Sequence, residues 1–223
     1  AAWIDYLAFT PPKPVNITGL FTRKLERLGG SAYVNGWGLP ETPSVVANSS
    51  DAEYRIPGLA RPHGVYMHPS PTLFVAVGWK SPINGQVAIS ANIADAHVNC
   101  GNGGEWWAQH HTSRKLVILG HGEYSEGGSG ELKEVKLQVH RGDIVRLVVG
   151  PRDGNHACDL THADMTLTEI GGLKRSWDLS KDISSNILDS NPLKDQHGND
   201  AVWHFYSGKV IEVSKASNNA MIV

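Results

Sequence analysis

The order of apolar and polar residues changes character near Val65. From that point, short runs of alternating or β-branched residues are separated by turn residues, a pattern typical of antiparallel sheets packed face to face. It predicts strands over residues 65–68, 73–79, 86–93, 105–109, 116–121, 134–140, 144–149 and 165–170. Strands at this spacing indicate an all-β fold, an antiparallel β-sandwich or jelly roll.

Two connections in this region carry strong turn signals. The segment SPING, residues 81–85, supplies Pro and Gly where a hairpin needs them, and HRGD, residues 140–143, is a short polar turn. Both are typical of tight connections between strands. We therefore predict a hairpin at SPING and a tight turn joining two strands at HRGD.

The rest of the chain has weaker patterns. Residues 1–61 are predicted to form an irregular N-terminal arm with one short amphipathic helix at 20–28, and residues 62–223 form the sandwich domain, unless the whole chain is one domain. A short helix is expected near residues 178–190, where apolar residues recur at helical intervals before Asn191-Pro192. The segment DAVWHFYSGKVIEVS then returns to a strand pattern.

Composition supports the β assignment and excludes several classes of partner. The 223 residues include 24 Gly and 12 Pro, which suits many short strands and turns. The formal charge of −2 leaves no basic excess for nucleic acid, and no apolar run is long enough to span a membrane. The N-terminus lacks the pattern of a signal peptide, so we expect a segment of a longer, multidomain chain.

The two cysteines, Cys100 and Cys158, lie in Gly- and Asn-rich loops beside predicted strands. Neither the haem-attachment pattern nor a paired zinc pattern is present, so the cysteines form a disulfide or lie reduced in the interior. The disulfide is the favoured alternative. It predicts an extracytoplasmic location, periplasmic or secreted.

The familiar catalytic and nucleotide-binding motifs are absent from the sequence. GGSGE, residues 127–131, differs from a nucleophile elbow at its last position, and there is no zinc-protease motif, Walker loop or dinucleotide fingerprint. We therefore expect no haem and no nucleotide cofactor. Binding rather than catalysis is the expected activity.

One loop offers oxygen ligands for a possible structural calcium ion. Between residues 153 and 164 the candidate donors are Asp153, Asn155, Asp159 and Asp164. Calcium accepts such donors together with main-chain carbonyls. The alternative is that these residues only cap turns around a disulfide.

The pair Trp106-Trp107 is the leading candidate for ligand binding. On a strand one indole faces inward and the other outward, and an outward indole forms a platform for a sugar ring. Asn102, Gln109 and His110 would supply hydrogen bonds at its rim. The alternative is that neighbouring loops bury both rings, as we expect for Trp79, Trp177 and Trp203, which suit the core or a structural contact.

The histidines do not predict a metal site. His110 and His111 are adjacent on a strand and point to opposite faces, so they cannot readily share one ion. A glycosidase or polysaccharide lyase would need a pair of carboxylates, or a Tyr or His with an Arg or Lys, in one cleft. The candidate residues for such a catalytic cluster are Glu105, Glu123, His121, Tyr124 and Arg114.

Three segments resemble a known type of module. They are HPSPTLFVAVGWKSPINGQVAISANIADAHVNCGNGGEWW, GDIVRLVVGPRDGNHACDLTHADMTLTE and WDLSKDISSNILDSNPLKDQHGNDAVWHFYSG, within residues 62–208. They resemble a module of planctomycete-type secreted proteins that also carry cytochrome-c-like domains, and its layout is similar to jelly-roll carbohydrate-binding modules. The resemblance implies a β-sandwich, export and a role in gripping polysaccharide.

These observations predict a non-catalytic module that binds a polysaccharide or oligosaccharide. Two other functions stay open. One is a polysaccharide lyase or glycosidase on the same scaffold, and the other is a structural domain that docks onto another protein.

Overall fold

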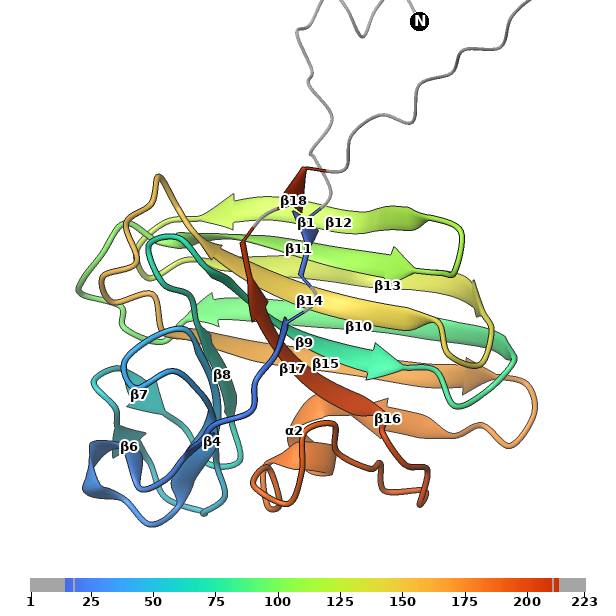
Figure 1. Ribbon diagram of the computed structural model, residues 1–223, viewed down its shortest axis with the longest axis horizontal. Helices are drawn as coiled ribbons and strands as arrows, with labels where there is room; N and C mark the ends of the chain where they lie inside the picture. The colour runs from blue at the N-terminus through green and yellow to red at the C-terminus, as the bar shows by residue number, and fades with distance from the viewer. Residues whose placement is uncertain (1–14, 18, 210, 213–223) are drawn as a thin grey trace, which may run out of the picture.

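The protein is a sandwich of two antiparallel β-sheets (Figure 1). The computed structural model describes residues 15–17, 19–209 and 211–212. The first sheet contains, in spatial order, β13 (Ser129–Val139), β10 (Gly85–Asp95), β15 (Thr161–Ile170), β8 (Val65–His68), β5 (Ser44–Asn48), β4 (Val34–Gly38) and β3 (Lys24–Leu25), with β16 (Ser176–Asp178) beside β15. The second contains β12 (Leu116–Tyr124), β11 (Gly104–His111), β14 (Ile144–Pro151), β9 (Phe74–Lys80), β17 (Trp203–Gly208) and β2 (Gly19–Leu20).

Two small pairs lie outside these sheets. They are β1 (Val15–Asn16) with β18 (Ile211–Glu212), and β6 (Tyr54–Arg55) with β7 (Leu59–Ala60). No helix in the described ranges has the length and apolar character that crossing a membrane requires.

The all-β prediction is confirmed, and each of the eight predicted strands is present within a few residues of its expected ends. The apolar residues that alternate with polar ones in the sequence are the residues that alternate between buried and more exposed positions in the structure. On β10, Val87, Ile89, Ala91 and Ile93 face the core, and the residues between them are more exposed. This period of two lets one face of the strand pack against the opposite sheet.

The predicted hairpin at SPING is wrong. β9 and β10 belong to different sheets, so residues 81–84 cross from one sheet to the other. The turn at HRGD does join two strands, β13 and β14, but it also changes sheet. The two crossovers pack together, because Ser81 N donates to Asp143 O at 2.7 Å and Gly142 N donates to Ser81 O at 2.8 Å. They form one end of the sandwich.

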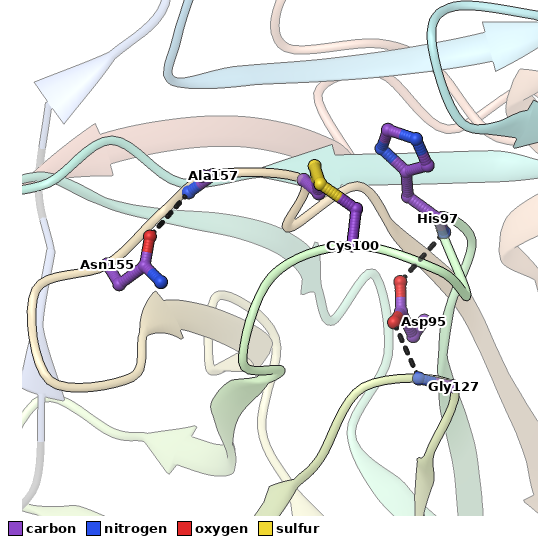
Figure 2. Close-up of a disulfide and its surroundings, with 7 residues drawn as sticks. Asp95, His97, Cys100, Gly127, Asn155 and Ala157 are labelled. Carbon is purple, nitrogen blue, oxygen red and sulfur yellow. Dashed lines mark hydrogen bonds between the residues drawn. A yellow bond between two sulfur atoms is a disulfide. The ribbon is translucent and has the colours of Figure 1, made fainter.

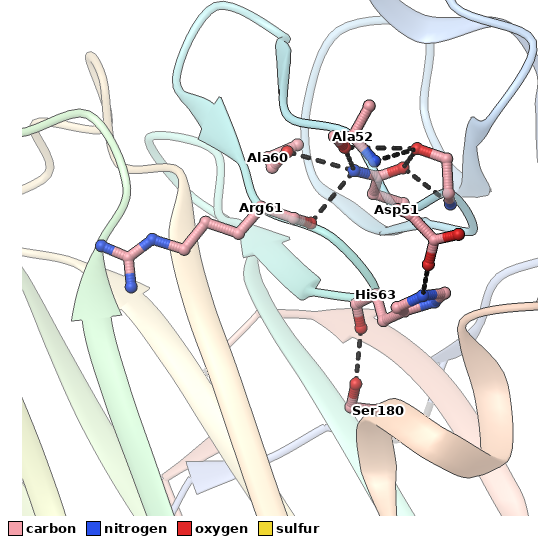
Figure 3. Close-up of polar contacts among 8 residues, drawn as sticks. Asp51, Ala52, Ala60, Arg61, His63 and Ser180 are labelled. Atoms are coloured by element: carbon pink, nitrogen blue, oxygen red, sulfur yellow. Dashed lines mark hydrogen bonds and ion pairs between the residues drawn. The ribbon is translucent and has the colours of Figure 1, made fainter.

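The segment predicted as an arm contributes strands to the first sheet. β5 pairs with β8, and β4 pairs with β5. The following loop is organised by Asn48, whose Nδ2 lies 2.7–3.1 Å from the carbonyl oxygens of Ala52, Ala60 and Arg61 (Figure 3). Within residues 19–61, strands β2, β3, β4 and β5 therefore belong to the two sheets of the sandwich, and β6 and β7 form a separate pair.

Of the two predicted helices, one is wrong and one is shorter than expected. Residues 20–28 contain the end of β2, all of β3 and the first residue of a short 3-10 helix, η1 (Leu28–Gly30), rather than an amphipathic α-helix. The helix expected near 178–190 is limited to α2 (Leu179–Ile183), capped by Asp178, whose side chain accepts from Lys181 N. Ser180 Oγ donates to the carbonyl of His63, which ties α2 to the loop before β8 (Figure 3).

Three tryptophans fill the core, as predicted. Trp79, Trp177 and Trp203 are completely buried between the sheets. Trp177 Nε1 donates to Asp195 at 2.6 Å, and Trp203 Nε1 donates to Asp182 at 2.8 Å. The indoles of Trp177 and Trp203 thus combine a large buried surface with a polar contact at the edge, which anchors the segment from α2 to β17 against the sandwich.

The disulfide between Cys100 and Cys158 is present, with the Cα atoms 5.6 Å apart. It joins the β10–β11 loop to the β14–β15 loop (Figure 2). The two loops lie at the end of the sandwich opposite the crossovers, since β11 and β14 are antiparallel partners that run between the two ends.

Candidate basic pocket

The predicted sugar platform is not exposed. Trp106 and Trp107 do point to opposite faces of β11, but only 4% and 5% of their surfaces are accessible. Trp106 faces the core between the sheets. Trp107 faces outward and is covered, so the expectation of an exposed indole is wrong.

The cover over Trp107 comes from the beginning of the described chain. Trp107 packs in an outer apolar cluster that includes Val15 and Ile17, and its ring centroid lies 5.5 Å from Phe74 and 4.8 Å from His121. These groups occupy the space above the indole that a sugar ring would need.

The other predicted sugar ligands serve structural contacts. Gln109 is fully buried, and in the amide orientation that satisfies its neighbours it bonds to the main chain of Val15. His110 Nε2 lies 3.2 Å from Asp143 Oδ2, and Asn102 Nδ2 donates to Arg152 O at 3.1 Å. The structure therefore does not gather these side chains into an exposed binding rim.

The predicted calcium ligands are directed to separate neighbours. Asp153 is close enough to Glu105 to contribute to its raised pKa, and Asp159 is buried near Asp95. Asp164 Oδ2 lies 3.6 Å from His162 Nδ1. Asn155 accepts from Ala157 N at 3.0 Å, the turn-capping role that was the alternative (Figure 2). Within the described ranges, the three carboxylates do not form a group that could share an ion.

The cluster proposed for catalysis is divided between distant places. Tyr124 points into the core, where its hydroxyl lies 2.6 Å from Thr161 Oγ1, and Arg114 is at the far end of the β11–β12 hairpin. Glu105 and Glu123 remain directly opposite each other. Burial, with a smaller effect of Glu123, raises the pKa of Glu105 to about 7.

A concave site lies at the crossover end of the sandwich. It is a pocket of about 870 Å³ bordered by the β11–β12 turn and the β13–β14 crossover. Its lining residues are His111, Thr112, Ser113, Arg114, Lys115, His140, Arg141, Gly142, Asp143, Ile144 and Arg146. The turn is held by Thr112, whose Oγ1 accepts from the main-chain N–H groups of Arg114 and Lys115.

Arg146 forms the inner wall of this pocket. It lies on β14, is only 5% exposed, and stacks its guanidinium 4.4 Å from the ring centroid of Tyr206. Its Nε and Nη1 atoms are buried and have no hydrogen-bond partner among the described residues. A buried guanidinium with unused donors is costly unless an acceptor reaches it, so this side chain is prepared to receive an anion.

The groups packed around Arg146 do not neutralise it. Burial, assisted by Arg146, lowers the pKa of His111 to about 3, and burial lowers the pKa of His204 to about 4. Burial raises the pKa of Tyr206. All three side chains are therefore uncharged at neutral pH, and none of them supplies a negative charge to Arg146.

Additional cations lie at the rim. Arg114, Lys115 and Arg141 are exposed around the opening, and the only acid among the lining residues, Asp143, is already bonded to His110 and to the main-chain N–H of His140. A second hollow of about 540 Å³ shares Arg141 and Gly142 with the pocket and adds one cation, Lys80, and one acid, Asp200. Cations therefore line both hollows, and the second hollow also contains a carboxylate.

Sequence reasoning missed Arg146, although a signal existed. It is the only charged residue in the run IVRLVV, residues 144–149, where every residue after Ile144 is buried. A lone arginine inside a β-branched strand rarely lies in the interior without a partner. This single arginine in an apolar strand, rather than the Trp106-Trp107 pair, was the sequence feature that indicated the pocket.

Comparisons with known proteins give no family assignment. No family model matches the chain, and no curated protein matches it. One solved structure has a weak likeness, a family GH115 4-O-methyl-α-glucuronidase, BtGH115A, with specificity for decorated arabinogalactans. The likeness has a TM-score of 0.23 and 9% identity and covers 73% of this chain but 19% of the other, so we base no argument on it.

Proposed function

We propose that this domain binds an acidic polysaccharide without cleaving it, through the pocket around Arg146. The observation that carries the proposal is the buried guanidinium whose Nε and Nη1 have no partner within the described chain. A uronate carboxylate or a sulfate ester offers the oxygen acceptors that such a donor pair binds best.

The arrangement of the remaining cations supports a polymer over a small anion. One charge lies deep in the pocket, while Arg114, Lys115, Arg141 and Lys80 follow the rim into the neighbouring hollow. A chain with acidic groups at regular intervals would engage both places. The rim contacts are exposed, so they add mainly to the rate of association and lose strength in salt.

The lining of the pocket supports binding rather than hydrolysis. Glycosidases use a pair of carboxyl groups on either side of the scissile bond. Here Asp143 is the sole carboxylate among the lining residues and is held by His110. The disulfide supports our further proposal that the domain functions outside the cytoplasm, as part of a longer secreted or periplasmic protein.

Affinity electrophoresis tests this proposal. The gels contain polygalacturonate, a sulfated galactan, or a neutral galactan, and the release of reducing ends is measured in parallel. We expect both acidic polymers, or one of them, to retard the protein, with little effect of the neutral polymer and no new reducing ends. Arg146→Met should weaken retardation at least about tenfold, as expected for the loss of a charge-assisted contact.

Lys133→Gln provides the matched control, because it removes an exposed positive charge on β13 outside the pocket. It should behave as the wild type. Equal retardation by neutral and acidic polymers, or wild-type retardation of Arg146→Met, would contradict the proposal.

A glycosidase is the second candidate, favoured by one observation. Glu105 and Glu123 face each other across β11 and β12, and the pKa of Glu105 is raised to about 7, mainly by burial, so it can hold a proton near neutral pH. Release of reducing ends that Glu105→Gln abolishes would support this function. Unchanged polymers in every assay would eliminate it.

A further inference from the structure

A histidine lies beside the disulfide at ligand distance. His97 comes three residues before Cys100, and a ring nitrogen of His97 and the two sulfur atoms of Cys100 and Cys158 all lie within 4.8 Å of one another. All three residues are partly buried. The β10–β11 loop thus supplies one imidazole and one sulfur, and the β14–β15 loop supplies the second sulfur.

The position of His97 is fixed while its ring is left unused. Asp95 accepts from the main-chain N–H of His97 at 2.7 Å and from that of Gly127 at 2.8 Å, which holds the loop (Figure 2). The Nδ1 atom of the His97 ring is buried and has no hydrogen-bond partner among the described residues. A buried nitrogen of this kind is costly to leave unpaired, so it marks a place for a ligand.

Two further imidazoles lie close by. The ring centroids of His68 and His156 are 6.1 Å apart, and His156 is two residues before Cys158. His156 therefore offers a further imidazole from the loop that carries Cys158, and imidazole is a ligand that zinc accepts.

We propose that, once the disulfide is reduced, His97, Cys100 and Cys158 bind one zinc ion that joins the same two loops. Two thiolates and an imidazole are donors that zinc prefers, and a fourth position is open to water or to His156. The two thiolates also balance the charge of the ion. The site is independent of the basic pocket, so it does not rest on the polysaccharide proposal.

The chemistry requires an external reductant, and a small dithiol is the expected class. The dithiol gives two electrons and two protons to the Cys100–Cys158 bond, becomes a cyclic disulfide itself, and leaves two thiols on the protein. Zinc then displaces one proton from each thiol. The metal and the disulfide are therefore mutually exclusive, and both close the same loop.

The change from a disulfide to a zinc site requires only a small movement of the two sulfur atoms. In a tetrahedral site with Zn–S bonds of about 2.3 Å, the sulfurs are roughly 3.8 Å apart, against about 2.05 Å in a disulfide. Rotation of the two cysteine side chains can supply this difference. The main chain of each loop can keep its present contacts.

The test uses the full protein, reduced with a phosphine that is then removed, and Co²⁺ as a spectroscopic probe. We expect one equivalent of Co²⁺ to give the strong visible absorption of a tetrahedral thiolate site, and Zn²⁺ to displace it. Zn²⁺ should also raise the melting temperature of the reduced protein toward that of the oxidised protein. The oxidised protein should show neither effect.

His97→Ala distinguishes a zinc site that includes the imidazole from metal binding by the two cysteine thiolates alone. The variant should form its disulfide normally, but its affinity for Zn²⁺ after reduction should fall on the order of 10- to 100-fold or more, since even outer-shell changes cost that much. His63→Ala is the control, an exposed histidine paired with Asp51 on another loop. Wild-type affinity in His97→Ala, or equal Co²⁺ spectra before and after reduction, would overturn the proposal.

Discussion

The side-chain amide of Gln109 bonds to the main chain of Val15 as a neighbouring strand would. Its Oε1 accepts from Val15 N at 2.8 Å and its Nε2 donates to Val15 O at 2.8 Å. One side chain thereby holds the segment that covers Trp107. Together with Phe74 and His121, this segment makes the outward indole an element of the fold rather than a binding surface.

Gln109→Ala should release that segment. It leaves the Val15 N–H and C=O without their partners, so we expect the free energy of unfolding to fall by about 2–4 kcal/mol. Hydrogen exchange at Val15, measured by mass spectrometry, should become much faster. Gln138→Ala, an exposed glutamine on β13, is the control and should change neither quantity. Unchanged exchange at Val15 would show that the amide contact does not hold this segment.

Arg146→Met should have opposite effects on stability and on anion binding. Removing an unpaired buried guanidinium while keeping an unbranched side chain is expected to leave the free energy of unfolding unchanged or raise it by about 1 kcal/mol. Galacturonate or sulfate should raise the melting temperature of the wild type but not that of the variant. A large loss of stability without ligand would instead assign Arg146 a structural role.

Glu105 should make stability depend on pH. Because its folded pKa is raised to about 7, the folded state keeps a proton that the unfolded chain loses near pH 4. The contribution of this protonation to the free energy of unfolding is therefore fully present below about pH 4. It is lost as the pH rises toward 7. With allowance for solvent screening, the free energy of unfolding of Glu105→Gln should exceed that of the wild type by about 1–2 kcal/mol at pH 8. At pH 4.5 the two values should differ little.

Urea unfolding at the two pH values measures this difference. Glu126→Gln, on an exposed turn, is the control and should follow the wild type. An equal gain at both pH values would indicate that packing rather than ionisation separates Glu105→Gln from the wild type.

Gly130 is required by the buried indole of Trp106. A Cβ at Gly130 would collide with Trp106 Nε1, and the ring cannot move away because it lies in the core. Gly130→Ala should lower the free energy of unfolding by about 1–3 kcal/mol, whereas the adjacent exposed Ser129→Ala should have little effect. In a Trp106→Ala background, Gly130→Ala should cost almost nothing more, because the colliding ring is gone.

The strands could be predicted because their signal is local. The alternation of Val87, Ile89, Ala91 and Ile93 needs only neighbouring residues and a core on one side. The sheet to which each strand belongs is not local information. SPING has hairpin residues, yet it bridges the two sheets, because turn chemistry fixes a change of direction and not the partner of the next strand.

The candidate site was mispredicted for a related reason. The sequence around Trp107 gives no sign that Val15 will cover it, since the contact joins segments far apart in the chain. The disulfide was favoured correctly because both cysteines lay in loops next to predicted strands. The lone charge of Arg146 in an apolar strand is visible in the sequence, but its pocket is not, because the crossover of residues 140–143 and the turn of residues 112–115 border it from distant parts of the chain.

The pairing of β1 with β18 has a mechanical consequence. Val15 pairs with Glu212, so the chain enters and leaves the described domain at the same end of this small ladder. The next pair inward has the same arrangement, with Gly19 opposite Ser207. Tension applied through the two chain ends would therefore unzip these hydrogen bonds one at a time, instead of loading a whole sheet in shear. The β1–β18 pair would yield first at low force, and the edge strand β2 would then peel from the second sheet.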